Sequence, residues 1–401
     1  MVYRQIDCFN IIMKYWKILG LHPEKDIWPY YNYYSFFVTF TFIILYDSLL
    51  SLNFFYLPRE LDKIMEDMVF YFMVLSVVSK AFTLLFQKEK IMSILNTLES
   101  DVFQPDTEEG QNIIKEAKIF NLRYLKIEAA ISATSHITHI TTPLIVHFFF
   151  NQKLELPVCT YSFLSNDTID EFVYPLYFYQ ILGMHFQVLY NVNIDSFFVG
   201  VMVYVTAQLD ILNNKYRHLT DNLPKGSDSD RSLNLKLNEA VNHYREIAKF
   251  CDLIQNVFSK TLFVQFGVAS LVICICLFRF TLPATADYYV FLSTYLFIMV
   301  IQIMIPCWLG TRIIYKSCLL ASAIYSSDWT PRSRRYTGSI RILVERLNKP
   351  LSIIAGKMFP VSLNTFTGVR DFSNNTYEDY KDNHVYKCIA NTRWRTLFSH
   401  Y

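Results

Sequence analysis

Histidines are the residues in this chain whose spacing comes nearest to a chemical site. His136 and His139 lie three positions apart in an apolar stretch, and His147 follows eight residues after His139. A metal ion would need these imidazoles on one helix face together with a carboxylate or a cysteine. We therefore predict no metal site, and we expect the histidines to line a cavity or to form hydrogen bonds between helices.

Other residue types show no catalytic spacing. The chain contains no nucleophile elbow, phosphate-binding loop or dinucleotide-binding fingerprint. The sequence therefore predicts neither an enzyme nor a cofactor. The eight cysteines are scattered and imply no disulfide framework. Asn166 begins an Asn-x-Thr sequon and predicts glycosylation on an outer loop.

Composition indicates a membrane protein. Of the 401 residues, 52% are hydrophobic and 18% charged, whereas soluble domains average roughly 45–50% and about 25%. A net charge of +2 argues against a partner made of nucleic acid. A membrane helix needs about 20 mostly apolar residues. Such windows predict an all-α bundle of spans in the lipid bilayer at 36–57, 68–86, 127–150, 172–209, 258–280 and 289–309, with a weaker seventh at 351–369.

Lysine and arginine are unevenly distributed between the connecting segments. They are concentrated in segment 1–35 and in segments 87–126, 210–257 and 310–350. The alternate loops hold only Arg59, Lys63 and Lys153. Because basic loops face the cytoplasm, we expect a cytoplasmic N-terminus. This orientation is the reverse of that of G-protein-coupled receptors, and the chain lacks the repeats of a secondary transporter.

The cytoplasmic segments are helical in pattern. Asp106 as N-cap, with Glu109 at the third position, predicts a helix start. A soft linker at 224–230 predicts that the fourth and fifth helices both extend below the membrane. Segment 310–350 should form a helical anchor, because it carries an amphipathic stripe. The stripe consists of Ile340, Leu343, Val344 and Leu347. The sequence leaves open whether it packs within the chain or against another subunit.

The last hundred residues resemble those of insect odorant receptors. Residues 317–329, SCLLASAIYSSDW, follow the pattern S-x-x-L-x-x-A-x-Y-x-S-x-W of that family. Residues 349–366, KPLSIIAGKMFPVSLNTF, follow its pattern K-P-x-x-x-x-A-G-K-F-x-x-x-S-L-x-T-F. More diffuse similarity covers residues 16–29, Asp195 and residues 243–266.

This resemblance implies a ligand-tuning subunit of an odorant-gated, non-selective cation channel. Such a subunit assembles with a co-receptor into a hetero-tetramer in the dendritic plasma membrane of olfactory neurons. The chain resembles a tuning subunit because it lacks the long loop insertion of the co-receptor. The resemblance also implies that the seventh helix lines the pore. Its residues would include Ser362, Leu363, Thr365 and Phe366.

The resemblance places the odorant pocket in the outer half of helices two to five. The corresponding residues here are Tyr71, Phe72 and Leu75, then His139, Thr142 and Val146, then Tyr177, Ile181 and Met184. An apolar pocket with few polar groups suits a small volatile organic ligand. At roughly 25 cal/mol per Å², burial of such a ligand yields a few kcal/mol. We therefore expect micromolar or weaker binding.

The chain departs from the family pattern at residue 370. Residues 370–401 are polar where the family continues as an apolar helix. Residues 360–369 would extend about 15 Å as a helix, half of the roughly 30 Å hydrocarbon core. We expect a retained intron or an alternative last exon after Val369, the alternative being a divergent tail. Two other functions stay open: a non-conducting truncated product, and a gustatory receptor of the same superfamily.

Overall fold

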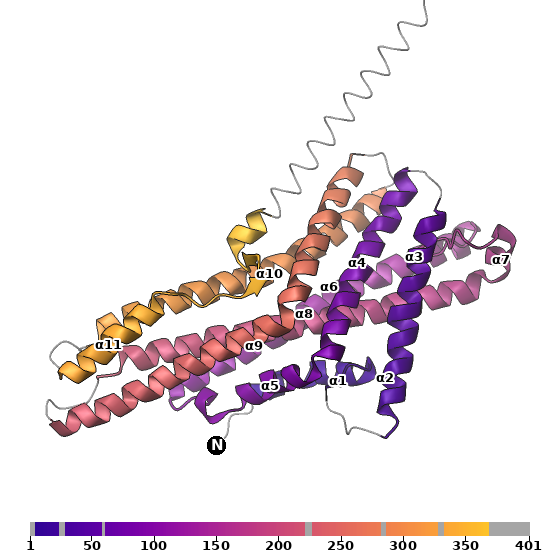
Figure 1. The fold of residues 1–401 in the computed structure, drawn as a ribbon. Coiled ribbons are helices and arrows are strands. Elements are labelled where there is room, and N and C mark those ends of the chain that lie inside the picture. Colours follow the sequence, from indigo (N-terminus) through magenta and orange to yellow (C-terminus); the bar gives the residue numbers. More distant parts are fainter. Residues whose placement is uncertain are drawn as a thin grey trace, which may run out of the picture.

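Four long helices frame an elongated bundle (Figure 1). They are α6 (Glu108–Phe150), α8 (Val173–Arg217), α9 (Ser227–Arg279) and α10 (Ala286–Ser326). The computed structural model describes residues 5–23, 29–57, 61–220, 227–281, 286–327 and 333–368. α8 is central, because it packs against α4 (Leu61–Phe86) and the other three long helices. Every side chain from 190 to 209 in α8 is buried, as expected for a helix surrounded by others.

Shorter elements complete the bundle. The short helices are α1 (Asn10–Ile18), α2 (Tyr31–Thr39), α3 (Tyr46–Tyr56), α5 (Lys88–Leu98), α7 (Asn166–Glu171) and α11 (Arg334–Leu347). A π-helical turn, Phe40–Leu45, joins α2 to α3 into one continuous rod. The only strands among the described residues are β1 (Ile354–Ala355) and β2 (Phe359–Pro360), which pair antiparallel. The predicted all-α class is confirmed.

Five helical stretches are long and apolar enough to cross a membrane. They are Tyr31–Tyr56, Asp67–Phe86, Val173–Arg217, Arg231–Arg279 and Leu292–Ser326. They include the first, second, fourth, fifth and sixth predicted spans. The third, 127–150, is helical as part of α6, but its histidines and threonines lower its hydropathy, and it does not belong to this set.

The long helices continue well past the predicted membrane spans. α10 runs on to Ser326 and α9 begins at Ser227, inside the segment predicted to be a linker. Residues 221–226 of that linker lie outside the described part of the chain. All four residues of the predicted amphipathic stripe in α11 are buried. Since α11 packs on α9 and α10 of this chain, part of the stripe's partner is intramolecular.

The predicted cap of α6 is wrong by one residue. Thr107 is the N-cap, and its side chain accepts a hydrogen bond from the backbone N–H of Gly110. Asp106 instead accepts a bond of 2.6 Å from Lys215 Nζ on α8. Glu109 accepts one of 2.8 Å from Asn214 Nδ2. These carboxylates therefore join two helices rather than close a capping box.

The predicted start of the seventh helix is also wrong, because residues 351–353 are irregular and residues 354–360 form a hairpin. Gly356 and Lys357, both with positive φ, make its turn. The hairpin is bonded to α9, where Ser259 Oγ donates to Ile354 O at 2.9 Å and Gln255 Oε1 accepts from Ile354 N at 3.1 Å. Helix begins only at Leu363 and is described to residue 368. Residues 369–401, including the departing tail, lie outside the described residues.

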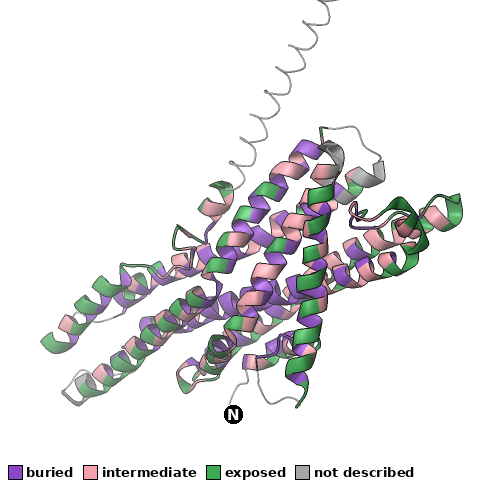
Figure 2. Ribbon diagram, turned by 45° about the vertical axis from the view of Figure 1, so that its right-hand side comes forward, coloured by how far each residue is buried: buried purple, intermediate pink, exposed green. Residues whose placement is uncertain are grey.

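Buried residues concentrate where the helices cross. Figure 2 shows exposed residues at the free ends of the long helices and buried ones along their middle. The main apolar core runs through this region and includes residues from α1, α4, α8, α9, α10 and α11. A separate and smaller apolar cluster lies between α3, α4 and the connection 151–165.

Candidate functional site

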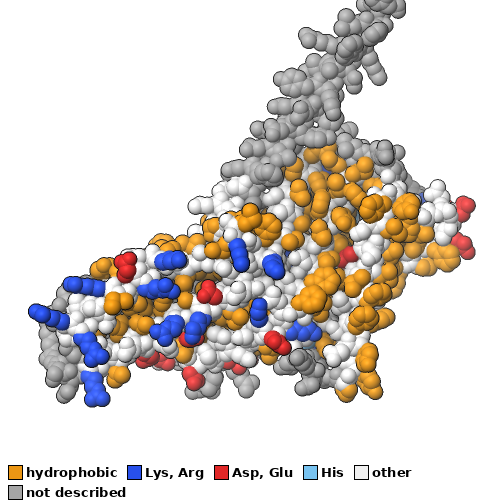
Figure 3. All heavy atoms as spheres, in the orientation of Figure 1, with side chains coloured by type: hydrophobic (Ala, Val, Ile, Leu, Met, Phe, Trp, Pro, Cys, Tyr) orange, Lys and Arg blue, Asp and Glu red, His pale blue; other side chains and the backbone are white. Residues whose placement is uncertain are grey.

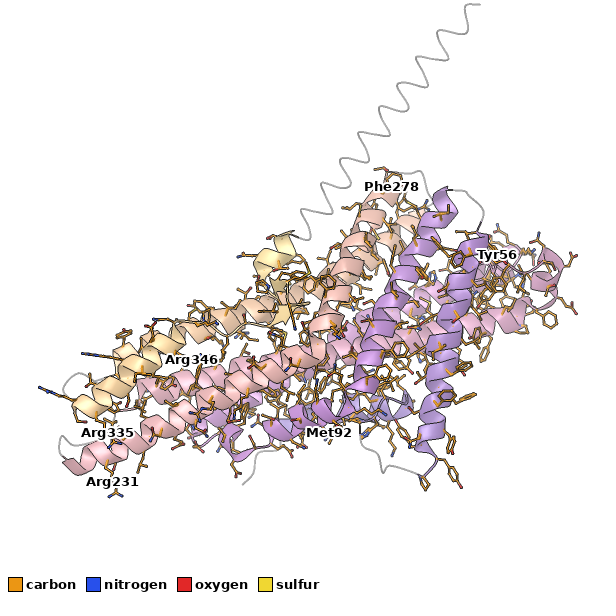
Figure 4. All side chains as sticks on the ribbon, viewed as in Figure 1. Tyr56, Met92, Arg231, Phe278, Arg335 and Arg346 are labelled. Carbon is orange, nitrogen blue, oxygen red and sulfur yellow. The ribbon has the colours of Figure 1, made fainter. Side chains whose placement is uncertain are left out.

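This smaller cluster, here called the second core, lies at the end of the bundle that carries α7. Its buried members come from α3, α4 and the connection 151–165: Tyr46, Leu50, Phe70, Val74, Val158, Cys159 and Tyr161. Figure 4 shows Tyr56 at this end, far from Arg231 and Arg335 at the free ends of α9 and α11. The second core is thus an apolar site at the end opposite the basic helix tips.

The connection 151–165 is bonded across this end of the bundle by buried polar side chains, and we call it the lid. Gln180 of α8 is fully buried. Its Oε1 accepts from the N–H of Val158 at 3.0 Å, and its Nε2 donates to Cys159 O at 2.8 Å. His139 Nε2 donates to Pro157 O at 2.6 Å. Together α8 and α6 therefore hold the lid's backbone in place.

A third attachment of the lid comes from α3. Asn53, which is 1% exposed, accepts from the N–H of Ser162 at 2.6 Å through Oδ1. Its Nδ2 donates to Asp67 Oδ2 at 2.8 Å. Because an unbonded buried amide is unfavourable by about 1–3 kcal/mol, these bonds stabilise the observed position of the lid.

A glycine allows α3 and α8 to approach closely beneath the lid. A Cβ atom at Gly183 would lie 2.2 Å from the ring of Tyr46. The ring of Tyr46 also contacts Tyr179, with a centroid separation of 6.0 Å. The floor of the second core is therefore aromatic and densely packed.

Little empty space remains between α3, α4 and the lid. A cavity of about 10 Å³ is lined by Leu50, Asn53, Phe54, Asp67, Phe70, Tyr71, Val158 and Cys159. This volume is about what one water molecule needs. The site is therefore closed in this conformation. A small organic molecule would have to displace the side chains of the lid.

Three of the predicted pocket residues lie around the second core, and a fourth, Tyr177, bonds to α6. Tyr71 lines the cavity, and its ring stacks on Phe54 at 5.7 Å. The ring of His139 lies 5.2 Å from that of Phe70. Met184 packs against the cluster, and the hydroxyl of Tyr177 donates to Ile140 O at 2.6 Å.

The other five predicted pocket residues lie outside the second core. Phe72 packs against the main core, and Leu75 is 42% exposed. Thr142 is exposed, and its hydroxyl donates to Thr138 O. Val146 and Ile181 are half-buried. On α4 the buried members of the second core are Phe70 and Val74.

One side of α4 had a signal in the sequence. Lys80 interrupts the second span, and a charged residue at membrane depth faces the protein interior. Val77 and Leu84, one turn on either side of Lys80, are both fully buried. Phase taken from Lys80 selects the side of α4 that packs into the main core, with Val77 and Leu84. The roles of Gln180 and Asn53 had no comparable signal, because their lid partners are backbone atoms.

An ion pair lies in the interior of the bundle. Lys80 Nζ is 2.8 Å from Asp195 Oδ1 and donates to Asn191 Oδ1 at 2.7 Å. Gln302 of α10 donates to the same two side chains, at 3.0 Å in the case of Asn191. One polar cluster therefore joins α4, α8 and α10. On the neighbouring α6, Glu128 accepts from Ser196 Oγ at 2.8 Å.

The histidines lie between α6 and α8. The rings of His136 and His185 are 5.5 Å apart, and a ring nitrogen of His147 lies 3.1 Å from Tyr174 Oη. Among the residues whose side chains are described, no three His, Cys, Asp or Glu groups lie close enough to hold a metal ion. Asn166 is exposed as the first residue of α7, and its glycosylation stays a prediction.

The chain is similar to known proteins over most of its length. The sequence model of the family described as 7tm Odorant receptor matches residues 60–373. Odorant receptor 42a of Drosophila melanogaster is 24% identical over 54% of this chain, and odorant receptor 22b of the same species is 27% identical over 41%. The chain spans about half the length of these curated relatives, 52% and 41% respectively.

Solved structures share the fold. The insect olfactory receptor OR5 from Machilis hrabei, in complex with eugenol, superposes with a TM-score of 0.81 at 16% identity. The match covers 92% of this chain and 96% of that one. A second structure of the same receptor gives the same TM-score at 17% identity.

Proposed function

Because the chain belongs to the 7tm odorant receptor family, we propose that it is the ligand-tuning subunit of an odorant-gated, non-selective cation channel. The channel would be a hetero-tetramer with a co-receptor in the plasma membrane, with the N-terminus in the cytoplasm. The second core beneath the lid is the observation that carries this proposal. It is an apolar site at the end of the bundle opposite the basic cytoplasmic segments.

The ligand would be a small, mainly apolar volatile molecule with one or two hydrogen-bonding groups. The second core offers mostly aromatic and aliphatic surface, with polar groups from Asn53, Gln180 and His139 at its lid. Eugenol, bound by the Machilis hrabei receptor, is a molecule of this kind. Entry of a ligand would displace the lid, and the energy of burial would offset the loss of lid contacts.

The polar cluster offers a route from this site to the pore helix. Gln302 on α10 bonds to Asp195 of α8, and Thr311, further along α10, accepts from the N–H of Leu363 at 2.9 Å. Ligand binding that separates α4 from α8 would shift α10 through Gln302. The same shift would move helix 363–368. We propose that this segment lines the pore with Ser362, Leu363, Thr365 and Phe366.

The proposal is tested by recording current from cells that express this chain with the co-receptor. A panel of volatile ligands identifies an agonist, and variants then locate its site. Phe70→Ala and Tyr71→Ala should raise the half-maximal agonist concentration by about tenfold, the effect of losing roughly 1.4 kcal/mol of contact. Leu75→Ala, on the exposed face of α4, is the matched control and should change it less than twofold.

If the chain is instead a non-conducting truncated product, recordings from the same cells should give a different result. The chain would reach the surface and co-purify with the co-receptor, but no agonist would evoke current. A transcript that splices after Val369 into an apolar stretch would then restore conduction. Full current from the 401-residue form would exclude this alternative. The family match to odorant receptors argues against the gustatory alternative.

A further inference from the structure

A second cavity lies between α6, α8 and α10, on the side where the basic segments lie. Its volume is about 480 Å³. Three cationic side chains line it, Arg123 of α6 and Arg312 and Lys316 of α10, together with two anionic ones, Glu116 and Asp210. Apolar side chains, including Ile113, Phe120 and Val203, form the rest of its wall.

Three helices independently place this cavity at the inner boundary of the membrane. Arg123 precedes the predicted span 127–150, Asp210 directly follows the span 172–209, and Arg312 follows the span 289–309. Two exposed apolar residues of α6, Ile119 and Ile127, lie on either side of Arg123 in the sequence. The cavity therefore adjoins both the apolar surface and the basic cytoplasmic part of the chain.

Two of its three cations have no carboxylate partner among the described residues. Lys316 is paired with Asp210. The guanidinium of Arg312 instead lies 4.9 Å from the centre of the Trp308 ring. This ring is in turn 6.0 Å from that of Phe120. Stacking on an aromatic ring restricts the plane of a guanidinium and leaves its N–H groups free.

We propose that this cavity binds the phosphorylated headgroup of an anionic lipid of the inner leaflet, such as a phosphoinositide. Arg123 and Arg312 would donate paired hydrogen bonds to phosphate oxygens, the geometry for which guanidinium is suited. Apolar wall residues such as Ile113 and Phe120 favour a lipid over a soluble phosphate, because they offer contact to the glycerol and acyl portions. The inference rests on the membrane orientation proposed above.

Bound lipid would add a polar link between α6 and α10, which contact here through the rings of Phe120 and Trp308. Asp210 and Lys316 already tie α8 to α10. A phosphate held by Arg123 and Arg312 would tie α6 to α10 in the same way. The headgroup should therefore stabilise the bundle against thermal unfolding as well as bind to it.

The test titrates the full-length chain in detergent with fluorescent phosphatidylinositol 4,5-bisphosphate. Arg123→Gln and Arg312→Gln should each weaken binding by about fivefold, the value for removing one cation worth roughly 1 kcal/mol at a lipid surface. Glu116→Gln should strengthen binding. An increase cannot arise from misfolding, so this variant separates a specific effect from structural damage. No odorant or current is needed, so a failure here is distinct from a failure of the proposed channel function.

Control measurements distinguish a specific lipid-binding site from general attraction to a basic surface. Arg335→Gln, at the exposed end of α11 (Figure 4), should leave binding unchanged. Equal loss with Arg335→Gln would overturn the proposal, as would equal affinity for phosphatidylcholine. Soluble inositol trisphosphate should compete weakly. If it binds as tightly as the lipid, the cavity is a site for a soluble phosphate and the lipid assignment is wrong.

Discussion

Lys80 places an ammonium group at membrane depth, where its donors must bind oxygen atoms of the protein. Asp195 and Asn191 provide these oxygens, and the side chain of Lys80 is 1% exposed. Removing one partner of such a pair leaves an uncompensated buried charge. The stability of the contact between α4 and α8 therefore depends on both residues together.

Lys80→Met should destabilise the protein by about 3–5 kcal/mol, because the carboxylate of Asp195 loses its cation. Thermal unfolding of the detergent-purified chain measures the effect. The double variant Lys80→Met/Asp195→Asn should recover part of the loss, since no unpaired charge remains. Lys90→Met, on the exposed side of α5, is the control and should change little. Additive losses in the double variant would contradict the pairing.

His243 is a buried base in the N-terminal half of α9. Its Nε2 donates to Gln208 Oε1 at 3.0 Å, and its ring packs against Phe103. Burial lowers the pKa of His243 to about 4, with the charge of Lys215 acting in the same direction and that of Asp106 opposing it. The folded protein therefore holds this imidazole neutral at physiological pH.

Stability should fall as the pH drops from about 6.5 to about 4. In that range the unfolded chain protonates His243, with its ordinary pKa of 6.5, while the folded chain does not. The stability that depends on a neutral His243 is therefore present in full above pH 6.5 and is lost progressively toward pH 4. Midpoints of thermal unfolding at several pH values measure it. His243→Gln should show a shallower fall than the parent chain, and an identical slope would contradict the assignment.

Helices were largely predictable from the sequence, and the hairpin was not. The amphipathic stripe of α11 follows from spacing alone, because Ile340, Leu343 and Leu347 repeat at the helical period. Residues 351–360 carry no such local signal. Their conformation depends on Gln255 and Ser259 of α9, which are distant in the sequence and bond to the hairpin backbone.

The residues of the candidate site were predictable only in part, because they too depend on tertiary contacts. Apolar composition identifies α4, α6 and α8 as helices, but only tertiary contact decides which face of each is buried. Tyr71 and His139 therefore lie near the second core while Leu75 and Thr142 do not. The lid residues Val158 and Tyr161 were missed because they lie in an irregular connection, where hydrophobic periodicity does not apply.

Gly310 controls how closely the hairpin can lie on α10. A Cβ atom there would be 2.0 Å from Val361 O, a contact that requires the backbone to move. Gly310→Ala should therefore destabilise the protein by about 1–3 kcal/mol and displace the segment that leads into helix 363–368. Thermal unfolding and agonist-evoked current measure the two effects.

Gly338→Ala is the matched control on α11. A Cβ atom at Gly338 would meet nothing within 4 Å. Alanine at this helical position should stabilise the protein by about 0.5–1 kcal/mol, since glycine loses more backbone entropy on folding. If Gly310→Ala and Gly338→Ala change the stability alike, the close contact at Gly310 does not cause the destabilisation.

At the scale of the molecule, charge and apolar surface are segregated. Figure 3 shows lysine and arginine side chains over the end formed by α9, α10 and α11, and hydrophobic side chains over the opposite part of that face. The 53 residues of α9 extend about 80 Å at 1.5 Å per residue. A hydrocarbon core of about 30 Å accounts for less than half of that length, so a large cytoplasmic body is expected.

The proposed orientation would place Asn166 outside the cell. The chain expressed in animal cells should then lose mobility-retarding glycan after endoglycosidase treatment. Asn166→Gln and Thr168→Ala should both lose the mobility shift of one glycan, because either change destroys the sequon at Asn166. Asp167→Asn leaves the acceptor pattern intact and serves as the control. No shift in the parent chain would count against either the orientation or access to this site.

The lid has a consequence for the timing and breadth of the response. If ligand enters only when the lid opens, apparent affinity is reduced by the fraction of time the lid is open. This factor is the same for every ligand, so sensitivity and selectivity are separable in this receptor. Loosening the lid through Lys153→Gln, which removes the ion pair between this lid residue and Asp170 of α7, should lower the threshold for all agonists in parallel, without reordering them. Such a receptor can gain sensitivity in evolution without any change in the residues that distinguish one odour from another.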